Sequence, residues 1–203
     1  MNRDVPRGTL SLRSLALIAS LLALAACATA PEIRYYRIVV PPPASAAAAA
    51  SPRLGVGQVQ AAEPYRQERI LYRSSPYRIQ HYPADRWETA PADMVQEALI
   101  RYLQASGRFA RVAAGKAGSA DPRLDVRLVA FEEVDEGEHW FGEVQLDYEV
   151  VRGGGSLLSG TSRQRVAAEG RTVEAVVVAL SRALTNALGE VADRTATALS
   201  SRP

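Results

Sequence analysis

The sequence is poor in the residue types on which most enzyme and metal sites are built. It contains one cysteine, Cys27, one lysine, Lys116, and two histidines, His81 and His139, that lie far apart. No glycine-rich phosphate loop, nucleophile elbow or Cys/His set with metal-ligand spacing is present. Catalysis normally requires a positioned base or nucleophile. The sequence therefore predicts a protein that is not an enzyme and that holds neither a metal nor a separate cofactor.

A single cysteine also excludes an intrachain disulfide, so the core alone must hold the fold. Removing residues 1–26 takes away three arginines and one aspartate and leaves 21 basic and 21 acidic residues, a net charge of about zero. Nucleic-acid binding normally needs a basic face, so no nucleic-acid partner is expected. The remaining length suits one domain with a linker.

The N-terminal residues follow the order of a bacterial export signal. A basic start leads into an apolar run over residues 15–23, then into small residues that end at Cys27. The run to residue 26 is too short to span a bilayer as a mature helix. We therefore expect residues 1–26 to be a signal peptide. A plain secretory signal, in which Cys27 has no role, is the alternative.

The segment Leu24-Ala25-Ala26-Cys27 resembles the lipobox of bacterial lipoproteins. The resemblance implies that Cys27 becomes the first residue after cleavage and carries S-diacylglycerol and N-acyl lipid, and several acyl chains give stable anchoring. The next residue is Ala28 and not aspartate. By resemblance to enterobacterial sorting, this favours the outer over the inner membrane. We expect a lipid-anchored protein on the periplasmic face of the outer membrane.

Alternating apolar and polar residues predict most of the strands. The predicted strands cover residues 33–40, 54–59, 69–73, 77–82, 124–131, 144–150 and 157–168, with a short extended piece at 109–112. Residues 69–82 are expected to form a hairpin, and the polar last strand is expected near an edge. Residues 27–53 are predicted to hold the lipidated end, the first strand and a Pro/Ala-rich loop, and residues 54–203 the folded domain.

Two helices are predicted from their caps and apolar stripes. Pro91 begins the first, with Thr89 or Ala90 as cap, and Gly107 ends it. Thr172 caps the second, which runs towards residue 199. Together these elements predict an α+β fold: a single antiparallel or mixed sheet of about four to six strands, with two long helices packed on one face.

Residues 124–150 carry nine acids and one arginine, a local net charge of −8. A solvated hairpin loop explains such a run, because charged turns are common. An electrostatic docking surface for a basic partner is the alternative. A calcium site is disfavoured, because the alternating Asp/Asn ligands of an EF-hand are missing. The acidic candidates for partner contact are Glu132, Glu133, Asp135 and Glu136.

The stretch Arg69-Ile70-Leu71-Tyr72-Arg73-Ser74-Ser75-Pro76-Tyr77-Arg78-Ile79 is followed by Tyr82-Pro83-Ala84-Asp85-Arg86-Trp87-Glu88 and the first helix. This order resembles the ABC-type transport auxiliary lipoproteins, the paraquat-inducible protein C-like family. The lipobox and Tyr35-Tyr36-Arg37-Ile38 agree as well, and the resemblance covers nearly the whole mature chain. Residues 44–50, rich in alanine, depart from the family and are read as a lengthened loop.

The resemblance implies an adaptor that works with an MCE-domain (mammalian-cell-entry) protein, an ABC permease and an ATPase. Such systems are thought to carry phospholipids or other apolar molecules across the periplasm.

For Trp87, packing between the hairpin and the helix is the alternative to partner contact. The remaining candidates for partner contact come from the Tyr-Arg hairpin and the turn into the helix, and the whole group is Tyr72, Arg73, Tyr77, Arg78, Arg86 and Trp87.

Two other functions stay open at this point. One is a structural or assembly lipoprotein for an outer-membrane barrel, and the other is a periplasmic lipid-binding carrier, which requires an apolar cavity. A homo-oligomer is also considered, on the condition that Ala183, Ala187 and Ala198 form an exposed strip on the last helix.

Overall fold

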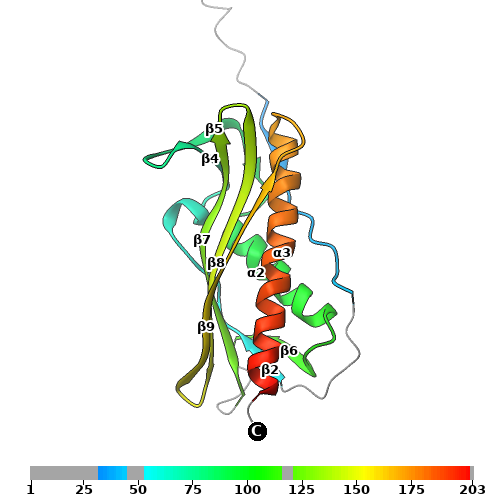
Figure 1. Cartoon of the computed structure of the whole chain (residues 1–203). Helices are drawn as coiled ribbons and strands as arrows, with labels where there is room; N and C mark the ends of the chain where they lie inside the picture. Colours follow the sequence, from blue (N-terminus) through cyan, green and yellow to red (C-terminus); the bar gives the residue numbers. More distant parts are fainter. Residues whose placement is uncertain (1–31, 45–52, 116–120, 202–203) are drawn as a thin grey trace, which may run out of the picture. The chain divides into compact units, whose positions relative to one another are not determined.

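Nine strands of the described chain form one mixed sheet, against which two long helices pack (Figure 1). The computed structural model describes residues 32–44, 53–115 and 121–201. The predicted signal peptide and Cys27 lie outside the described residues. The strands are β1 (Arg34–Tyr36), β2 (Arg53–Val56), β3 (Gln60–Ala61), β4 (Arg69–Ser75), β5 (Arg78–Trp87), β6 (Arg111–Ala114), β7 (Arg123–Glu136), β8 (His139–Arg152) and β9 (Gly155–Ala167). The helices are the 3-10 helix η1 (Glu63–Arg66), α2 (Pro91–Ala105) and α3 (Val173–Ser200).

The α+β prediction is correct in outline, but the predicted count of about four to six strands is wrong, because the sheet has nine. Four short strands join the long ones. β1, β2, β3 and β6 have two to four residues each and pair in parallel with strands distant in sequence. The segments predicted at residues 33–40, 54–59 and 109–112 overlap β1, β2 and β6, but no segment was predicted at β3, whose two residues are too few for a period-two pattern.

The long strands form the frame of the sheet. β7, β8 and β9 follow one another as an antiparallel meander, and β4 and β5 form the predicted hairpin. The hairpin joins the meander through a parallel pairing of β4 with β7, in which Tyr72 lies opposite Glu133. In the described chain β9 pairs only with β8, so the polar strand lies at an edge as predicted.

Both predicted helices form with the expected caps. Ala90 caps α2 and Pro91 lies in its first turn. The Thr172 Oγ1 accepts a hydrogen bond of 3.2 Å from the backbone N–H of Ala175 at the start of α3. α3 is long and apolar enough to cross a membrane by length and composition, but most of that stretch is buried against the sheet, which is typical of a core helix. Figure 1 shows α3 running along β8 and β9.

The proposed exposed alanine strip on α3 does not exist. Ala183 and Ala187 are fully buried, and Ala198 is half-buried. The two alanines pack into the core together with the leucines of the same helix face, Leu180, Leu184 and Leu188. The condition under which the sequence suggested a homo-oligomer is therefore not met.

A β-bulge in β7 decides which side chains face α3. Leu128 pairs with Leu146, but the next pair is Ala130 with Gln145, so one residue of β7 is extra. Beyond the bulge the alternation is shifted by one residue. Glu132, which would otherwise share the face of Leu128, therefore points away from α3 and lies opposite Glu143.

Close packing between β8 and α3 depends on Gly142. A Cβ atom at this position would lie 2.5 Å from the backbone nitrogen of Leu180 and 2.8 Å from the carbonyl carbon of Ala179. These are helix backbone atoms, which cannot move aside as a flexible side chain can. β8 and α3 therefore approach each other as closely as a glycine allows.

We expect Gly142→Ala to lower the free energy of unfolding by about 1–3 kcal/mol, because overpacking forces backbone shifts. Urea unfolding followed by circular dichroism measures this. Gly155→Ala is the matched control, because a Cβ there meets its nearest atom, the carbonyl oxygen of Arg152, at 3.7 Å. Equal unfolding midpoints for the two variants would contradict the close approach.

Candidate functional site

Arg73 of β4 lies between two buried carboxylates. Glu132 of β7 and Glu143 of β8 are cross-strand partners and are only 4% and 2% exposed. The Nε of Arg73 lies 2.9 Å from the Glu132 Oε1, and its Nη2 donates a hydrogen bond of 3.2 Å to the Glu143 Oε1. Like charges directly opposite each other destabilise a sheet. The guanidinium between them compensates both charges.

Two further side chains complete this group. Arg163 of β9 donates to both Glu143 carboxylate oxygens, at 3.0 and 3.1 Å. The Tyr65 hydroxyl of η1 donates to the Glu132 Oε2 at 2.9 Å. Burial, and then the charge of Glu132, raise the pKa of Tyr65, so this hydroxyl keeps its proton. We call Tyr65, Arg73, Glu132, Glu143 and Arg163 the charge cluster.

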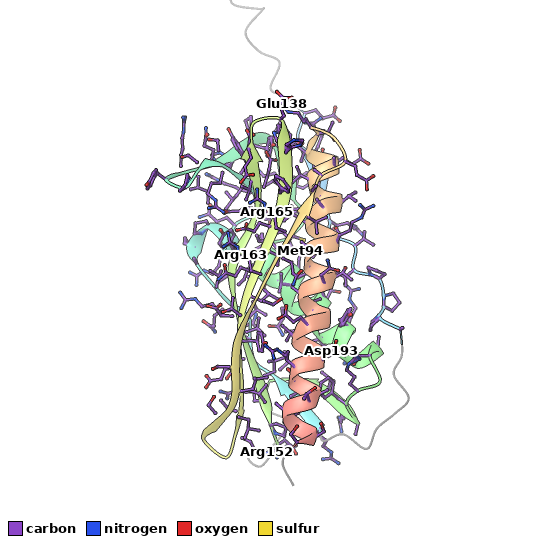
Figure 2. The ribbon with its side chains drawn as sticks, in the orientation of Figure 1. Met94, Glu138, Arg152, Arg163, Arg165 and Asp193 are labelled. Atoms are coloured by element: carbon purple, nitrogen blue, oxygen red, sulfur yellow. The ribbon has the colours of Figure 1, made fainter. Side chains whose placement is uncertain are left out.

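The charge cluster forms the floor of a cleft beneath the tip of the β4–β5 hairpin. Two adjoining hollows of about 420 and 440 Å³ share Arg73, Pro76, Glu143 and Arg163 in their lining. We call them together the hairpin cleft. Figure 1 shows the β4–β5 hairpin projecting sideways from the meander. Figure 2 labels Arg163 and Arg165 along β9, below the turn that carries Glu138.

The Tyr77 side chain at the tip of the β4–β5 hairpin is exposed to solvent. Tyr77 is 99% exposed, and Ile79 on the following strand is 48% exposed. Arg78 is also exposed and lines the hairpin cleft with both of them. A rigid hairpin that presents an aromatic ring and a cation carries two of the residue types enriched in protein–protein contacts.

The acidic run is a solvated turn only around residues 136–138, and the acids before it lie on β7. Glu132 and Glu133 are buried strand residues, so they cannot contact a partner directly. Glu136 pairs with Arg165 at 2.6 Å, and the Asp135 Oδ1 accepts a hydrogen bond from the Gly137 backbone N–H at 2.9 Å. Arginines from β4 and β9 thus compensate much of this negative charge within the fold.

Glu133 lies on the opposite face of β7 from Glu132. The Tyr82 hydroxyl donates to its Oε2 at 2.6 Å, and the Tyr82 ring lies 5.0 Å from that of Tyr72. Glu133 is 1% exposed. Burial raises the pKa of Glu133 to about 7, the Tyr82 hydrogen bond opposes the shift and the charge of Asp135 adds to it.

Trp87 and Arg86 stabilise the fold: Trp87 packs in the core, and Arg86 binds backbone carbonyls. Trp87 is fully buried, and its ring lies edge-on to that of Phe131 at 5.5 Å. The packing alternative for Trp87 therefore holds, and the ring is not available to a partner. The guanidinium of Arg86 donates to the backbone carbonyls of Tyr82, Pro83 and Asp85, which fixes the preceding bend.

The structure thus separates the predicted contact residues. Those it brings together around the hairpin cleft are Arg73, Tyr77, Arg78, Glu132, Asp135 and Glu136. Sequence reasoning missed Tyr65, Glu143, Arg163 and Arg165 as members of this region. The glycine at position 137 was the signal that could have identified Glu143. Its φ is 70°, as a tight turn requires, and a hairpin closed there places Glu143 opposite Glu132.

A second hollow, of about 790 Å³, lies between residues 37–42 and α2. Its lining mixes apolar side chains such as Met94 and Val40 with the charged Glu97 and Arg101. Within the described ranges, no group of three or more His, Cys, Asp or Glu side chains is placed to hold a metal ion.

Among the comparisons with known proteins, a family model shows the family and solved structures show the fold. A family model described as the ABC-type transport auxiliary lipoprotein component matches residues 36–192. A Xanthomonas campestris protein of family DUF330 has a TM-score of 0.73 and 22% identity, over 81% of this chain and 96% of that one. An uncharacterized protein has a TM-score of 0.67 and 15% identity, over 81% of this chain and 99% of that one. A hypothetical Chlamydia trachomatis protein has a TM-score of 0.53 and 7% identity, over 75% of this chain and 100% of that one. No curated protein matches the chain.

We expect Arg73→Met to lower the free energy of unfolding by about 3–5 kcal/mol, because it leaves two facing buried carboxylates without the cation between them. Chemical unfolding measures the loss. Arg78→Met, at an exposed position on the same hairpin, is the matched control and should change stability by less than about 0.5 kcal/mol. Adding Glu132→Gln to Arg73→Met should recover part of the loss. Equal effects of the two arginine variants would refute the role of Arg73.

We expect Glu133→Gln to change how stability depends on pH. Because the pKa of Glu133 is raised to about 7 from an ordinary 4.5, the folded chain keeps a proton that the unfolded chain releases. The associated stability is present below pH 4.5 and is lost as the pH rises to about 7. Glutamine does not ionise, so the stability of the variant relative to that of the native chain should rise by about 3 kcal/mol between pH 4 and pH 8. Unfolding at a series of pH values measures this, and parallel profiles would contradict it.

Proposed function

Because the chain belongs to the ABC-type transport auxiliary lipoprotein family, we propose that it is a non-catalytic adaptor of an ABC-type transport system. The family match over residues 36–192 is the observation that carries this proposal. The match names a lipoprotein and a transport component, so association with a membrane and with an ABC-type system follows from the family. The adaptor role, the anchor and the partners are the proposal.

In this proposal Cys27 carries the S-diacylglycerol and N-acyl lipid and holds the domain on the periplasmic face of the outer membrane. The partner is an MCE-domain protein, which acts with an ABC permease and an ATPase. The cargo is a phospholipid or another apolar molecule. The lipobox and the small Ala28 after Cys27 support this placement.

The hairpin tip is the proposed docking element. Tyr77 is fully exposed, yet its hairpin is held to β7 and β8 by the ion pairs of Arg73 with Glu132 and Glu143. A rigid element loses little conformational entropy on binding, which favours affinity. Tyr77 and Arg78 would supply the first contacts, with the exposed Arg78 guanidinium meeting an acidic group of the partner.

We expect Tyr77→Ser to lower the recovery of the transport partner about tenfold, which corresponds to about 1.4 kcal/mol of binding free energy. The measurement is crosslinking of the full-length acylated chain in native membranes, then affinity capture and mass spectrometry. Val178→Ser, which removes a 43% exposed apolar side chain on α3, is the matched control.

The outcomes separate the candidate functions. Recovery of an MCE-domain protein and a permease by the native chain supports the adaptor. Recovery of an outer-membrane barrel alone would refute it in favour of an assembly lipoprotein. Bound lipid with no protein partner would identify a carrier. Undiminished recovery by Tyr77→Ser would refute the docking element and leave the adaptor standing.

A further inference from the structure

The first described segment presents one apolar edge to solvent. Along residues 33–40 the side chains of Tyr36, Ile38 and Val40 pack against the core. The residues between them point outward, as the alternation of an extended chain requires. Ile33, Tyr35 and Val39 are 50%, 65% and 66% exposed. We call these three residues the outer strip.

The outer strip is held in place by its inward neighbours. The Nε of Arg34 lies 2.8 Å from an oxygen of Asp85, which is 3% exposed. Residues 34–36 pair in parallel with residues 85–87 of β5. The Val39 backbone N–H donates to the Ser181 Oγ of α3 at 3.1 Å. The strip is therefore a fixed feature of the domain surface.

The two arginines beside the outer strip are paired, and the exposed Glu32 precedes Ile33. Arg37 lies between Tyr35 and Val39 and forms an ion pair of 2.7 Å with Glu88, as Arg34 does with Asp85. The strip thus offers one tyrosine and two aliphatic side chains with little net charge. Tyrosine is enriched where an apolar medium meets water, because its ring is apolar and its hydroxyl is polar.

The strip also lies close in sequence to the proposed anchor. Ile33 follows Cys27 by six residues, and an extended chain covers at most about 3.3–3.6 Å per residue. Whatever path the intervening residues take, the Cα atom of Ile33 lies within about 20 Å of that of Cys27. The cysteine of an acylated chain sits at the bilayer surface. Tyr35 and Val39 follow Ile33 along the same strip, two and six residues later in the sequence.

We propose that the outer strip lies against the headgroup region of the anchoring membrane, with Ile33 and Tyr35 in contact and Val39 further away. This inference rests on the proposed acylation of Cys27. The strip carries little net charge, so the contact is with electrically neutral phospholipid and does not depend on salt. The lipid and the strip then fix the domain at two points, which gives the hairpin cleft a constant direction relative to the membrane.

The test uses the sequence's single cysteine. Lipid occupies the thiol of Cys27, so an introduced cysteine is the one free thiol of the acylated chain. Ile33→Cys, Tyr35→Cys and Val39→Cys are each labelled with the fluorophore NBD. The full-length chains are placed in vesicles of phosphatidylcholine and phosphatidylethanolamine that contain headgroup spin-labelled lipid. Arg152→Cys, at the far end of β8 from Glu138 in Figure 2, is the control.

We expect quenching at residues 33 and 35 to be at least twofold above that at residue 152, with residue 39 between them, and unchanged from 0.05 to 0.5 M NaCl. Equal quenching at residues 35 and 152 would overturn the inference. So would a blue shift at residue 35 that appears only when the transport partner is added, because the strip would then be a protein interface.

Mass spectrometry of the same samples separates the two proposals. An acylated chain without quenching at residues 33 and 35 refutes the outer strip alone. A chain that carries no lipid on Cys27 refutes the anchor, and the inference fails with it. Thermal unfolding followed by circular dichroism shows that each labelled variant keeps the native fold.

Discussion

The position of the β4–β5 hairpin depends on one arginine between two buried glutamates. Arg73 joins β4 to β7 through Glu132 and to β8 through Glu143, and Arg163 extends the same network to β9. Each carboxylate loses its hydration on burial, so neither is tolerable without its cation. The polar network therefore specifies where the projecting hairpin sits on the sheet, a role that a purely apolar contact performs with less geometric precision.

Sequence reasoning recovered the elements whose signals are local. Thr172 and Pro91 marked the starts of α3 and α2, because caps and first-turn prolines act within a few residues. The alternation along β7, β8 and β9 was also readable, and so was the polar edge strand. These features together give the α+β outline of the fold.

The remaining features of the sheet and of the candidate site depend on contacts between residues that are distant in the sequence. β1 and β6 fall within or overlap segments predicted as extended, but their parallel partners β5 and β2 could not be read from the sequence. The bulge after Leu128 shifts the alternation and carries Glu132 to the face away from α3, where local charge counting predicts a solvated loop. Of the ten predicted contact residues only Tyr77, Arg78 and Glu136 are exposed. Trp87 is core, because hydropathy does not distinguish a packed ring from an interfacial one.

The parallel pairings have a consequence for how the chain assembles during synthesis. β1 requires β5, and β2 requires β6 and β7, so each early strand waits for a segment that is made much later. Pairing between distant segments folds slowly, because long loops must close first. The leading end of the chain therefore carries unpaired strand edges until residue 124 has emerged, and such edges are where aggregation begins. A chaperone that shields extended segments would be most effective on the first half of this sequence.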